Sequence, residues 1–411
     1  MYSNPGLLSG LRIIECATFV AGPSGCMALG QMGADVIRVD PIGGAADFNR
    51  WPLSPRTEKS LYWTSLNKGK RSVAVDLRSP RGRELVIALA TAPGPDAGVV
   101  VDNNVGRPWL SFSALSNRRT DVIQVHIQGH PDGRPAVDYT VNPEVGVPWL
   151  TGPVDAAEPV NHVLPAWDLL TGMTMTAGLL AALRRRDRQG VGAYLELALA
   201  DVARAGVANL GWFAEADENG ANRPRIGNHL YGSFGVDFAT RDGHRVMVVA
   251  LTDRQWYALR SVTKTEDVFA ALEHALSIDL ALESDRYVYR ETITAILRPW
   301  FASRAFEEVR LELEAAHVLW GKFNTMTEAV EEHRREDGPS VLADVDQPGV
   351  GMMISARSPL RLGAEYGSTS AAPTLGEHTD EVLGEVLGLG EIELARLHDA
   401  GVIASGAHPQ G

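Results

Sequence analysis

One carboxylate, Asp168, lies within the apolar stretch "VNHVLPAWDLLTGM" at residues 160–173. As the first residue of a helix, an Asp satisfies free backbone N–H groups and needs no other role. A chemical role is the alternative. Apolar burial raises the pKa of a carboxyl group, whereas a helix N-terminus favours its anion. A buried Asp at a helix start can therefore stay charged while it loses water, and can attack an activated acyl carbon. Both roles are compatible and stay open.

Basic residues gather in the span "NKGKRSVAVDLRSPRG", which contains Lys68, Lys70, Arg71, Arg78 and Arg81. Such a cluster either binds phosphates through charge-assisted hydrogen bonds or forms a solvated positive face. The loop "DNNVGRPW" (102–109) then places Asn103, Asn104 and Arg107 just after a predicted strand. Ligands of open α/β sheets bind beyond the carboxyl ends of strands, so this position favours a ligand role.

The sequence lacks the motifs that several other kinds of catalytic or cofactor site require. The turn "ATFVAGPSG" departs from G-x-G-x-x-G, which disfavours a nicotinamide cofactor although Asp40 ends a strand where a ribose-binding acid would lie. No G-x-S-x-G elbow occurs, which disfavours a serine hydrolase. The two cysteines, Cys16 and Cys26, form neither a disulfide framework nor a four-ligand metal site, so we expect a cytoplasmic protein without a metal.

Composition limits the partners. A net charge of −13 disfavours nucleic acid and anionic membranes as partners. The N-terminus lacks the basic and apolar segments of a signal peptide. We also expect no membrane span, because no run of about 18 apolar residues stands out.

The elements that position these residues alternate between strands and helices. Strands are expected at 12–15, 34–39, 72–77, 97–103 and 121–129, with a helix at 79–90. This alternation predicts an α/β fold, with a mostly parallel sheet covered by helices. Long helices are expected from Asp168 to about Arg186 and from about 198 to 216, around the short strand "AYLEL". A strand in "DGHRVMVVAL" begins a smaller α+β region, and the end of the chain reads as a linker and a final helix. The predicted domains are 1–224, which is Rossmann-like and carries Asp168, a small α+β domain at 225–340, and a C-terminal linker and helix at 341–411 that return to the large domain.

Five segments together resemble the family III coenzyme A transferases, in family order and spacing. They are "LRIIECATFVAGPSGCMALGQMGADVIRVDP", "NKGKRSVAVDL", "VDYTVNPEVGVPWLTG", "PAWDLLTGMTMTAGLLAALRRRDRQGVG" and "LGEHTDEVLGEVLGL". Five further segments resemble a subgroup that moves CoA between the two carboxyl groups of one small dicarboxylic acid. These are "DPIGG", "VDYTVNP", "VNHVLPAWD", "RPRIGNHLYGSFG" and "LTDRQW".

This resemblance implies a Rossmann-like large domain, a smaller domain and an interlocked homodimer. It makes Asp168 the catalytic residue, with CoA as part of the substrate and of a covalent intermediate and with no separate cofactor. It implies that the partner is an acyl-CoA thioester of a small dicarboxylic acid. The substrate-binding residues that it implies are Val20, Ala21, Val75, Asp76, Leu77, Arg78, Asn103, Asn104, Arg107, Asp138 and Tyr139.

The sequence also departs from relatives. The 102–109 loop is shorter than in intermolecular transferases and lacks their Phe after the first Asn. Gly227, Gly232 and Gly235 are spread out where some relatives have a consecutive glycine lid. Related α-methylacyl-CoA racemases use a His–Asp pair where this chain has Val137 and Asp138, and valine moves no proton, which disfavours racemisation. An intermolecular CoA transferase remains the alternative function, and a non-catalytic CoA-binding protein is a third.

Overall fold

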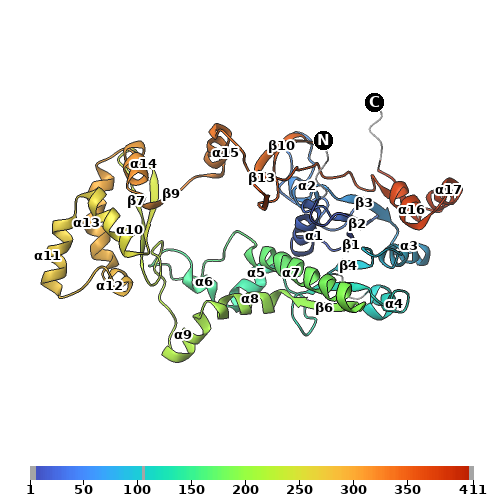
Figure 1. Ribbon diagram of the computed structural model, residues 1–411, viewed down its shortest axis with the longest axis horizontal. Helices are drawn as coiled ribbons and strands as arrows, with labels where there is room; N and C mark the ends of the chain where they lie inside the picture. The colour runs from blue at the N-terminus through green and yellow to red at the C-terminus, as the bar shows by residue number, and fades with distance from the viewer. Residues whose placement is uncertain (1–5, 104–106, 407–411) are drawn as a thin grey trace. The chain divides into compact units, whose positions relative to one another are not determined.

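The computed structural model describes residues 6–103 and 107–406 (Figure 1). By its internal contacts the chain divides into two compact units. The first contains Met1–Val145, His162–Glu215 and Gly338–Gly411, and the second contains Gly146–Asn161 and Ala216–Asp337. Asp168 and Asp138 both belong to the first unit. The predicted domain bounds at 1–224, 225–340 and 341–411 stay a prediction.

A seven-stranded sheet forms the centre of the first unit, in the order β14-β3-β2-β1-β4-β5-β6. Six neighbouring strands are parallel, and only the short β14 at one edge is antiparallel. The fold class expected from the sequence, a mostly parallel α/β sheet, is therefore confirmed. The strands are β1 (Arg12–Cys16), β2 (Asp35–Pro41), β3 (Arg71–Val75), β4 (Val99–Asp102), β5 (Ile123–Gln128), β6 (Ala193–Ala198) and β14 (Ile403–Ala404).

Two apolar cores cover the two faces of this sheet, because neighbouring residues of a strand point to opposite faces. Ile13 of β1 packs with Leu29 of α1 (Ala21–Gln31) and Leu179 of α7 (Ala166–Gln189). Ile14 packs on the other face with Leu89 of α3 (Pro80–Ala90). The remaining helices of this unit are α2 (Leu61–Asn67), α4 (Phe112–Ser116), α5 (Asp138–Glu144), α8 (Leu199–Asn209), α16 (Thr379–Leu387), α17 (Glu391–Asp399) and the single 3₁₀ turn η1 (Pro108–Leu110).

The strand order changes direction between β1 and β4. Both strands end at the same edge, where Cys16 pairs with Asp102 in the parallel register. The chain leaves β1 towards the start of α1 and leaves β4 towards Asn103. In open α/β sheets this switch point is the place where ligands bind, so the topology brings the predicted CoA contacts Val20, Ala21 and Asn103 to one edge.

The second unit has its own core around a three-stranded antiparallel sheet. Its strands are β7 (Phe234–Ala239), β8 (Arg245–Ala250) and β9 (Leu319–Lys322). The Asp242–Gly243 turn joins β7 to β8, and Phe234, Trp256 and Phe301 are fully or almost fully buried beside them. Its helices are α6 (Val147–Leu150), α10 (Asp253–Thr263), α11 (Glu266–Leu276), α12 (Glu283–Val288), α13 (Arg290–Ala302), α14 (Phe306–Ala315) and α15 (Met326–Arg335), and α9 (Trp212–Asn219) begins in the first unit and ends here.

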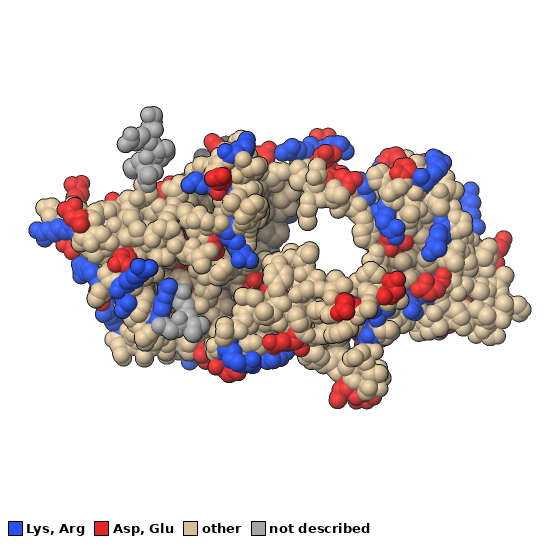
Figure 2. Space-filling view, turned by 180° about the vertical axis from the view of Figure 1, so that it is seen from behind, with Lys and Arg blue, Asp and Glu red and all other residues tan. Residues whose placement is uncertain are grey.

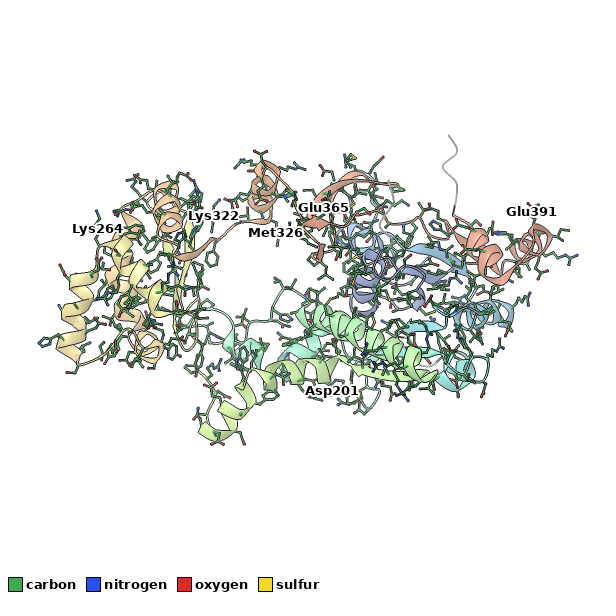
Figure 3. All side chains as sticks on the ribbon, viewed as in Figure 1. Asp201, Lys264, Lys322, Met326, Glu365 and Glu391 are labelled. Atoms are coloured by element: carbon green, nitrogen blue, oxygen red, sulfur yellow. The ribbon has the colours of Figure 1, made fainter. Side chains whose placement is uncertain are left out.

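Two predicted elements are wrong in extent. The helix expected at 198–216 is broken, because α8 ends at Asn209 and Gly211 takes a positive φ of 76° before α9 begins. The C-terminal region is also not a linker with one helix. It forms the hairpins β10 (Leu342–Gln347) with β11 (Gly351–Ala356) and β12 (Arg361–Leu362) with β13 (Glu365–Tyr366). After α16, α17 begins at Glu391 (Figure 3), and β14 then joins the sheet.

α7 is long and apolar enough, by length and composition, to cross a membrane, contrary to the expectation that no such segment exists. In the first unit its Met175 and Leu179 are buried in the core against α1 and the sheet. A core helix satisfies the same criterion of length and composition.

On the face drawn in Figure 2, basic side chains are interspersed with acidic ones.

Candidate active site

The helix that carries Asp168 begins two residues earlier than the sequence predicts. α7 starts at Ala166, and Asp168 lies in its first turn. The interpretation of Asp168 as the helix cap is therefore wrong. The capping acceptor is Asp138, whose Oδ2 accepts the backbone N–H of Trp167 at 2.7 Å and of Asp168 at 3.1 Å. A carboxylate from α5 thus satisfies the free donors of α7, and the Asp168 side chain is left available for chemistry.

Asp138 is held on its other side by a histidine. Its side chain is 1% exposed, and its Oδ1 lies 2.6 Å from Nε2 of His162. The start of α7 is further tied to α5 because Trp167 Nε1 donates to Asn142 Oδ1 at 2.9 Å. The two helix starts are therefore joined by several short polar contacts, which fix the backbone around Asp168.

Tyr139 follows Asp138 in α5 and contacts the segment that leads into α7. Its hydroxyl donates to the carbonyl oxygen of Val163 at 2.9 Å. Its ring lies edge-on to the His162 ring, with centroids 6.2 Å apart. Tyr139 was predicted to bind substrate, and the structure places it beside the Asp138–His162 pair.

Burial and, to a smaller extent, the neighbouring charge of Asp138 raise the pKa of Asp168 to about 7, against the positive charge of Arg50, which lowers it. From the sequence, the helix start is expected to keep the buried Asp168 charged. In the structure, its position in the first turn of α7 does not hold the pKa at its ordinary value. A pKa near 7 leaves a substantial fraction of Asp168 ionised at neutral pH. A carboxylate with this little solvation is a stronger nucleophile than one in water.

The sequence reasoning missed three residues linked to this site: Arg50 and Tyr62, which interact with Asp168 by charge, and His162, which pairs with Asp138. The charges of Arg50 and of Asp168 both act on Tyr62, although burial is the main cause that raises the pKa of Tyr62 to about 12. The guanidinium of Arg50 lies over the Tyr62 ring at 5.4 Å. Only His162 had a usable signal, because it is part of the segment "VNHVLPAWD" that carries the resemblance.

Val20 and Ala21, two predicted CoA contacts, form the start of α1 next to α7. Val20 is the residue before the helix, and both are buried. A Cβ added to Gly172 would lie 2.8 Å from the carbonyl oxygen of Ala21 and 2.4 Å from Ser24 Oγ. Because Gly172 has no side chain, α1 and α7 approach closely here, one helical turn after Asp168.

Val75, Asp76, Leu77 and Arg78 form the connection between β3 and α3. Asp76 Oδ1 accepts the backbone N–H of Arg78 at 3.0 Å, and the Arg78 side chain is exposed. These residues lie at the same edge of the sheet as Val20, but β2 separates β3 from β1.

The basic cluster predicted around 68–81 does not act as one group. Lys70 is buried and pairs with Glu15 at 2.7 Å, Arg71 pairs with Asp35 and Arg81 pairs with Glu393. Within the described part of the chain, Arg78 is the member that is exposed and forms no ion pair. Asp40, at the strand end where a ribose-binding acid would lie, is buried and accepts from Arg38 Nε at 2.8 Å.

Asn103 uses its amide group inside the protein. Its Oδ1 accepts the backbone N–H of Thr18 at 3.1 Å, and its Nδ2 donates to the Thr18 carbonyl oxygen at 3.0 Å. Asn103 therefore fixes the loop that precedes Val20. Arg107 lies over the Trp109 ring at 6.0 Å. Asn104 lies outside the described residues.

A model of CoA-transferase family III matches residues 8–379, which is most of the chain. The chain belongs to CoA-transferase family III. It is 49% identical over 402 residues to a 2-methylfumaryl-CoA isomerase of Chloroflexus aurantiacus, covering 97% of this chain and 98% of that protein. It is 30% identical to a succinyl-CoA:mesaconate CoA-transferase of Haloarcula marismortui, covering 92% of this chain and 96% of that one. A crystal structure of a CaiB/BaiF family protein from Brucella suis matches with a TM-score of 0.74 and 26% identity, covering 93% of this chain and 100% of that one.

This family III CoA transferase thus brings part of its predicted site together. Asp168, Asp138 and Tyr139 lie within one network, and the α1–α7 contact brings the Val20–Ala21 segment close to it. Asn103 joins through Thr18. The connection 75–78 lies farther along the same edge of the sheet.

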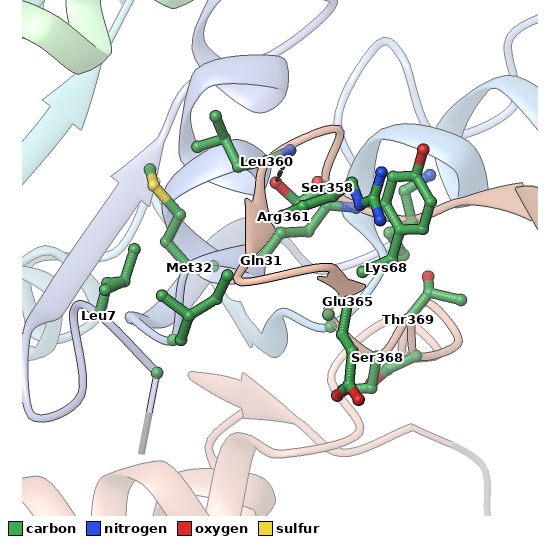
Figure 4. Close-up of a pocket in the computed structure, with 18 residues that line it drawn as sticks. Leu7, Gln31, Met32, Lys68, Ser358, Leu360, Arg361, Glu365, Ser368 and Thr369 are labelled. Carbon is green, nitrogen blue, oxygen red and sulfur yellow. Dashed lines mark hydrogen bonds between the residues drawn. The ribbon is translucent and has the colours of Figure 1, made fainter. Parts of the chain in front are cut away.

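A cavity of about 450 Å³ lies at the other end of α1, away from Asp168 (Figure 4). It is lined by residues 30–33 at the end of α1, by Lys68 and by the β12–β13 region. Apart from Lys68 of the basic cluster, none of the residues predicted to bind substrate or to catalyse lines it. Among the residues that the structure describes, no group of three or more His, Cys, Asp or Glu side chains is suited to hold a metal ion.

Proposed function

We propose that this family III CoA transferase moves CoA from the C1 to the C4 carboxyl group of 2-methylfumaryl-CoA (mesaconyl-CoA), with Asp168 as the nucleophile. The observation that carries the proposal is the 49% identity to a 2-methylfumaryl-CoA isomerase over 97% of the chain. The surroundings of Asp168 support the chemistry, because its carboxyl group is poorly solvated and its position is fixed through Asp138.

The reaction begins when an Asp168 carboxylate oxygen attacks the thioester carbonyl carbon of the substrate. The carbon–sulfur bond breaks, which gives a mixed anhydride and CoA thiolate. The thiolate then attacks the Asp168 carbonyl carbon of the anhydride, which leaves an aspartyl-CoA thioester and the free dicarboxylate. Each step exchanges one acyl bond for another, so no oxidant, reductant or metal enters the balance.

The dicarboxylate then turns within the site. Its C4 carboxylate attacks the aspartyl-CoA thioester, releases the thiolate and forms the second anhydride. The thiolate attacks the C4 carbonyl carbon of this anhydride, which gives the product thioester and restores the Asp168 carboxylate. The turn is productive because an enclosed acid stands at a very high effective concentration relative to free acid.

In this proposal Val20, Ala21, residues 75–78, Asn103, Asn104 and Arg107 bind CoA along the edge of the sheet. Asn103 does so through the Thr18 backbone, since its amide group is already used there. Asp138 and Tyr139 lie at the acyl end. The active form is a homodimer in the cytoplasm with neither nucleic acid nor membrane as a partner, and CoA is part of the substrate, with no other cofactor.

Intermolecular transfer between two acids is the second candidate, favoured by the 30% identity to a succinyl-CoA:mesaconate CoA-transferase. Racemisation is disfavoured because Val137 supplies no proton-transfer group. The separating experiment supplies 2-methylfumaryl-CoA together with a large excess of isotope-labelled free mesaconate. Intramolecular transfer predicts full conversion to the C4 thioester without label. Label in the product that rises with the concentration of mesaconate contradicts it and supports the intermolecular reaction.

A further inference from the structure

Arg50 is a cation held in place without the use of its hydrogen-bond donors. Its guanidinium lies over the ring of Phe19 at 5.5 Å and over the ring of Tyr62 at 5.4 Å. Within residues 6–103 and 107–406, its side chain forms no ion pair with an acidic side chain. Aromatic faces attract the guanidinium group, while its N–H donors point along the plane of the group. The donors therefore remain available for a ligand.

Asp47 fixes the segment that presents this guanidinium. The buried Asp47 accepts the backbone N–H of Phe19 through Oδ2 at 2.9 Å, and its carbonyl oxygen accepts the backbone N–H of Arg50 at 3.2 Å. Phe19 has a positive φ of 68°, a conformation that a residue with a large side chain rarely adopts. Asp47 is held in turn by Arg38 at 3.0 Å. The buried Asp47 thus fixes both Phe19, whose ring lies against the guanidinium, and the backbone of Arg50.

The same support places Arg50 at the acyl end of the site. Phe19 directly precedes Val20 and Ala21, and Ala21 approaches α7 at Gly172, one turn after Asp168. The charge of Arg50 reaches Asp168 and lowers its pKa, although the two groups form no ion pair in the structure. Arg50 and Asp168 therefore influence each other by charge without neutralising each other by direct contact.

The acidic groups near Asp168 would repel a substrate that carries a second carboxylate, so binding such a substrate requires a cation. Asp168 and Asp138 both carry acidic groups at the start of α7, and a second carboxylate on the acyl group is repelled by them. A guanidinium offers two parallel N–H donors that match a carboxylate. Among the described residues, Arg50 is a basic residue whose charge acts on Asp168.

We infer that Arg50 binds the carboxylate of the substrate that is not reacting with Asp168, and so selects acyl-CoA thioesters that carry a second carboxylate. This inference rests on the proposed function and deepens it. Arg50 holds the C4 carboxylate while Asp168 attacks C1. After the free acid turns, Arg50 holds the C1 carboxylate while C4 reacts. One fixed cation thus serves both halves of the reaction.

The test compares two thioesters that differ in one group. They are 2-methylfumaryl-CoA and (E)-2-methylbut-2-enoyl-CoA, in which a methyl group replaces the distal carboxylate. The rate of formation of the aspartyl-CoA thioester on Asp168 is measured by mass spectrometry for each. The ratio of the two rates is then compared among the wild type, Arg50→Gln and Arg50→Lys. Because each protein supplies its own ratio, a partly unfolded fraction cancels.

Arg50→Gln is expected to lower the ratio by about 10- to 100-fold, the range for loss of a hydrogen bond to a charged group. Arg50→Lys is expected to lower it less, because the charge stays and the fork is lost. Arg118→Gln is the matched control, since Arg118 is exposed and pairs with Glu84, and its ratio should equal that of the wild type.

An unchanged ratio in Arg50→Gln overturns the inference, whether both rates fall together or neither falls. An equal fall would assign Arg50 to Asp168 or to the CoA moiety. If the wild-type rate with the methyl analogue is below detection, the same ratio is taken from dissociation constants of the two thioesters on an Asp168→Asn background. Failure of the proposed function looks different: without the covalent mechanism the wild type forms no aspartyl-CoA thioester from 2-methylfumaryl-CoA, and with intermolecular transfer labelled free mesaconate enters the product.

Discussion

Asp138 accepts the backbone N–H of Asp168 through Oδ2 at 3.1 Å, although the two residues lie 30 positions apart in the sequence. This contact gives the two acids different roles. Asp138 stabilises the helix start and is fixed by His162, whereas the side chain of Asp168 forms no hydrogen bond with another described residue. The negative charge of Asp138 also raises the pKa of Asp168. The following predictions separate these effects.

The activity should depend on a single ionisation of Asp168. Burial and Asp138 raise the pKa of this group to about 7, and only the ionised form attacks a thioester. We therefore expect kcat/KM to fall about tenfold for each pH unit below a midpoint near 7. The measurement is kcat/KM for 2-methylfumaryl-CoA from pH 5 to pH 9. A profile that stays flat down to about pH 5 would contradict the raised pKa.

Asp138→Asn should move this acidic limb to lower pH. The substitution removes the negative charge that disfavours ionisation of Asp168, so the pKa of Asp168 falls. The amide keeps one acceptor oxygen, which cannot serve both His162 and the two N–H groups of α7. A buried donor that loses its partner costs about 1–3 kcal/mol. We expect a lower free energy of unfolding in denaturant titration together with the shifted pH profile. A limb that stays in place or moves upward would show that Asp138 does not act on Asp168 by charge.

Asp168→Asn should abolish turnover without destabilising the fold at neutral pH. The folded state favours the neutral form of Asp168, because the pKa of this group is raised to about 7. As the pH rises from about 4 to about 7, the unfolded chain loses this proton first, so the wild type loses stability over that window. The variant does not. The melting temperature of Asp168→Asn relative to the wild type should therefore increase between pH 4 and pH 8. A variant that becomes relatively less stable as the pH rises would contradict the direction of the shift.

Arg107→Ala should raise the KM for the CoA thioester more than it lowers kcat. Arg107 lies beyond the carboxyl end of β4 at the switch point of the sheet, where CoA is proposed to bind. Loss of a contact made equally in the ground state and the transition state raises KM alone. Arg118→Ala, in the same unit but exposed and paired with Glu84, serves as the control. An unchanged KM with a collapsed kcat would place Arg107 at the reacting carboxyl groups instead.

The parallel sheet could be predicted because its signals are local. Short apolar segments such as "SVAVDL" and "AGVVVDN" mark buried strands, and β3 and β4 form within them. The break at Gly211 and the C-terminal strand β14 could not be predicted in the same way. A glycine inside a helical pattern does not by itself end the helix, and two residues that pair with β3 carry no periodicity.

In the candidate site too, features with a local sequence signal could be predicted and contacts between distant segments could not. Asp168 stands out in the sequence because an acid among apolar residues is unusual, and its position at the start of α7 follows from the local pattern. Its cap could not be predicted, because the acceptor comes from another helix. Arg50 lay in a segment without any motif, and only the folded chain brings its guanidinium over Phe19 and Tyr62. In the basic cluster, Lys70 is buried and its charge is paired with Glu15, a contact that the sequence does not show.

The covalent role of Asp168 is tested most directly by mass spectrometry of the protein after brief incubation with 2-methylfumaryl-CoA. The proposed mechanism predicts a peptide that contains Asp168 and carries the mass of CoA less one water, formed within a single turnover. The same peptide from Asp168→Asn should carry no adduct, and that variant should have no turnover. An adduct on another residue, or substantial turnover by Asp168→Asn, would contradict the mechanism.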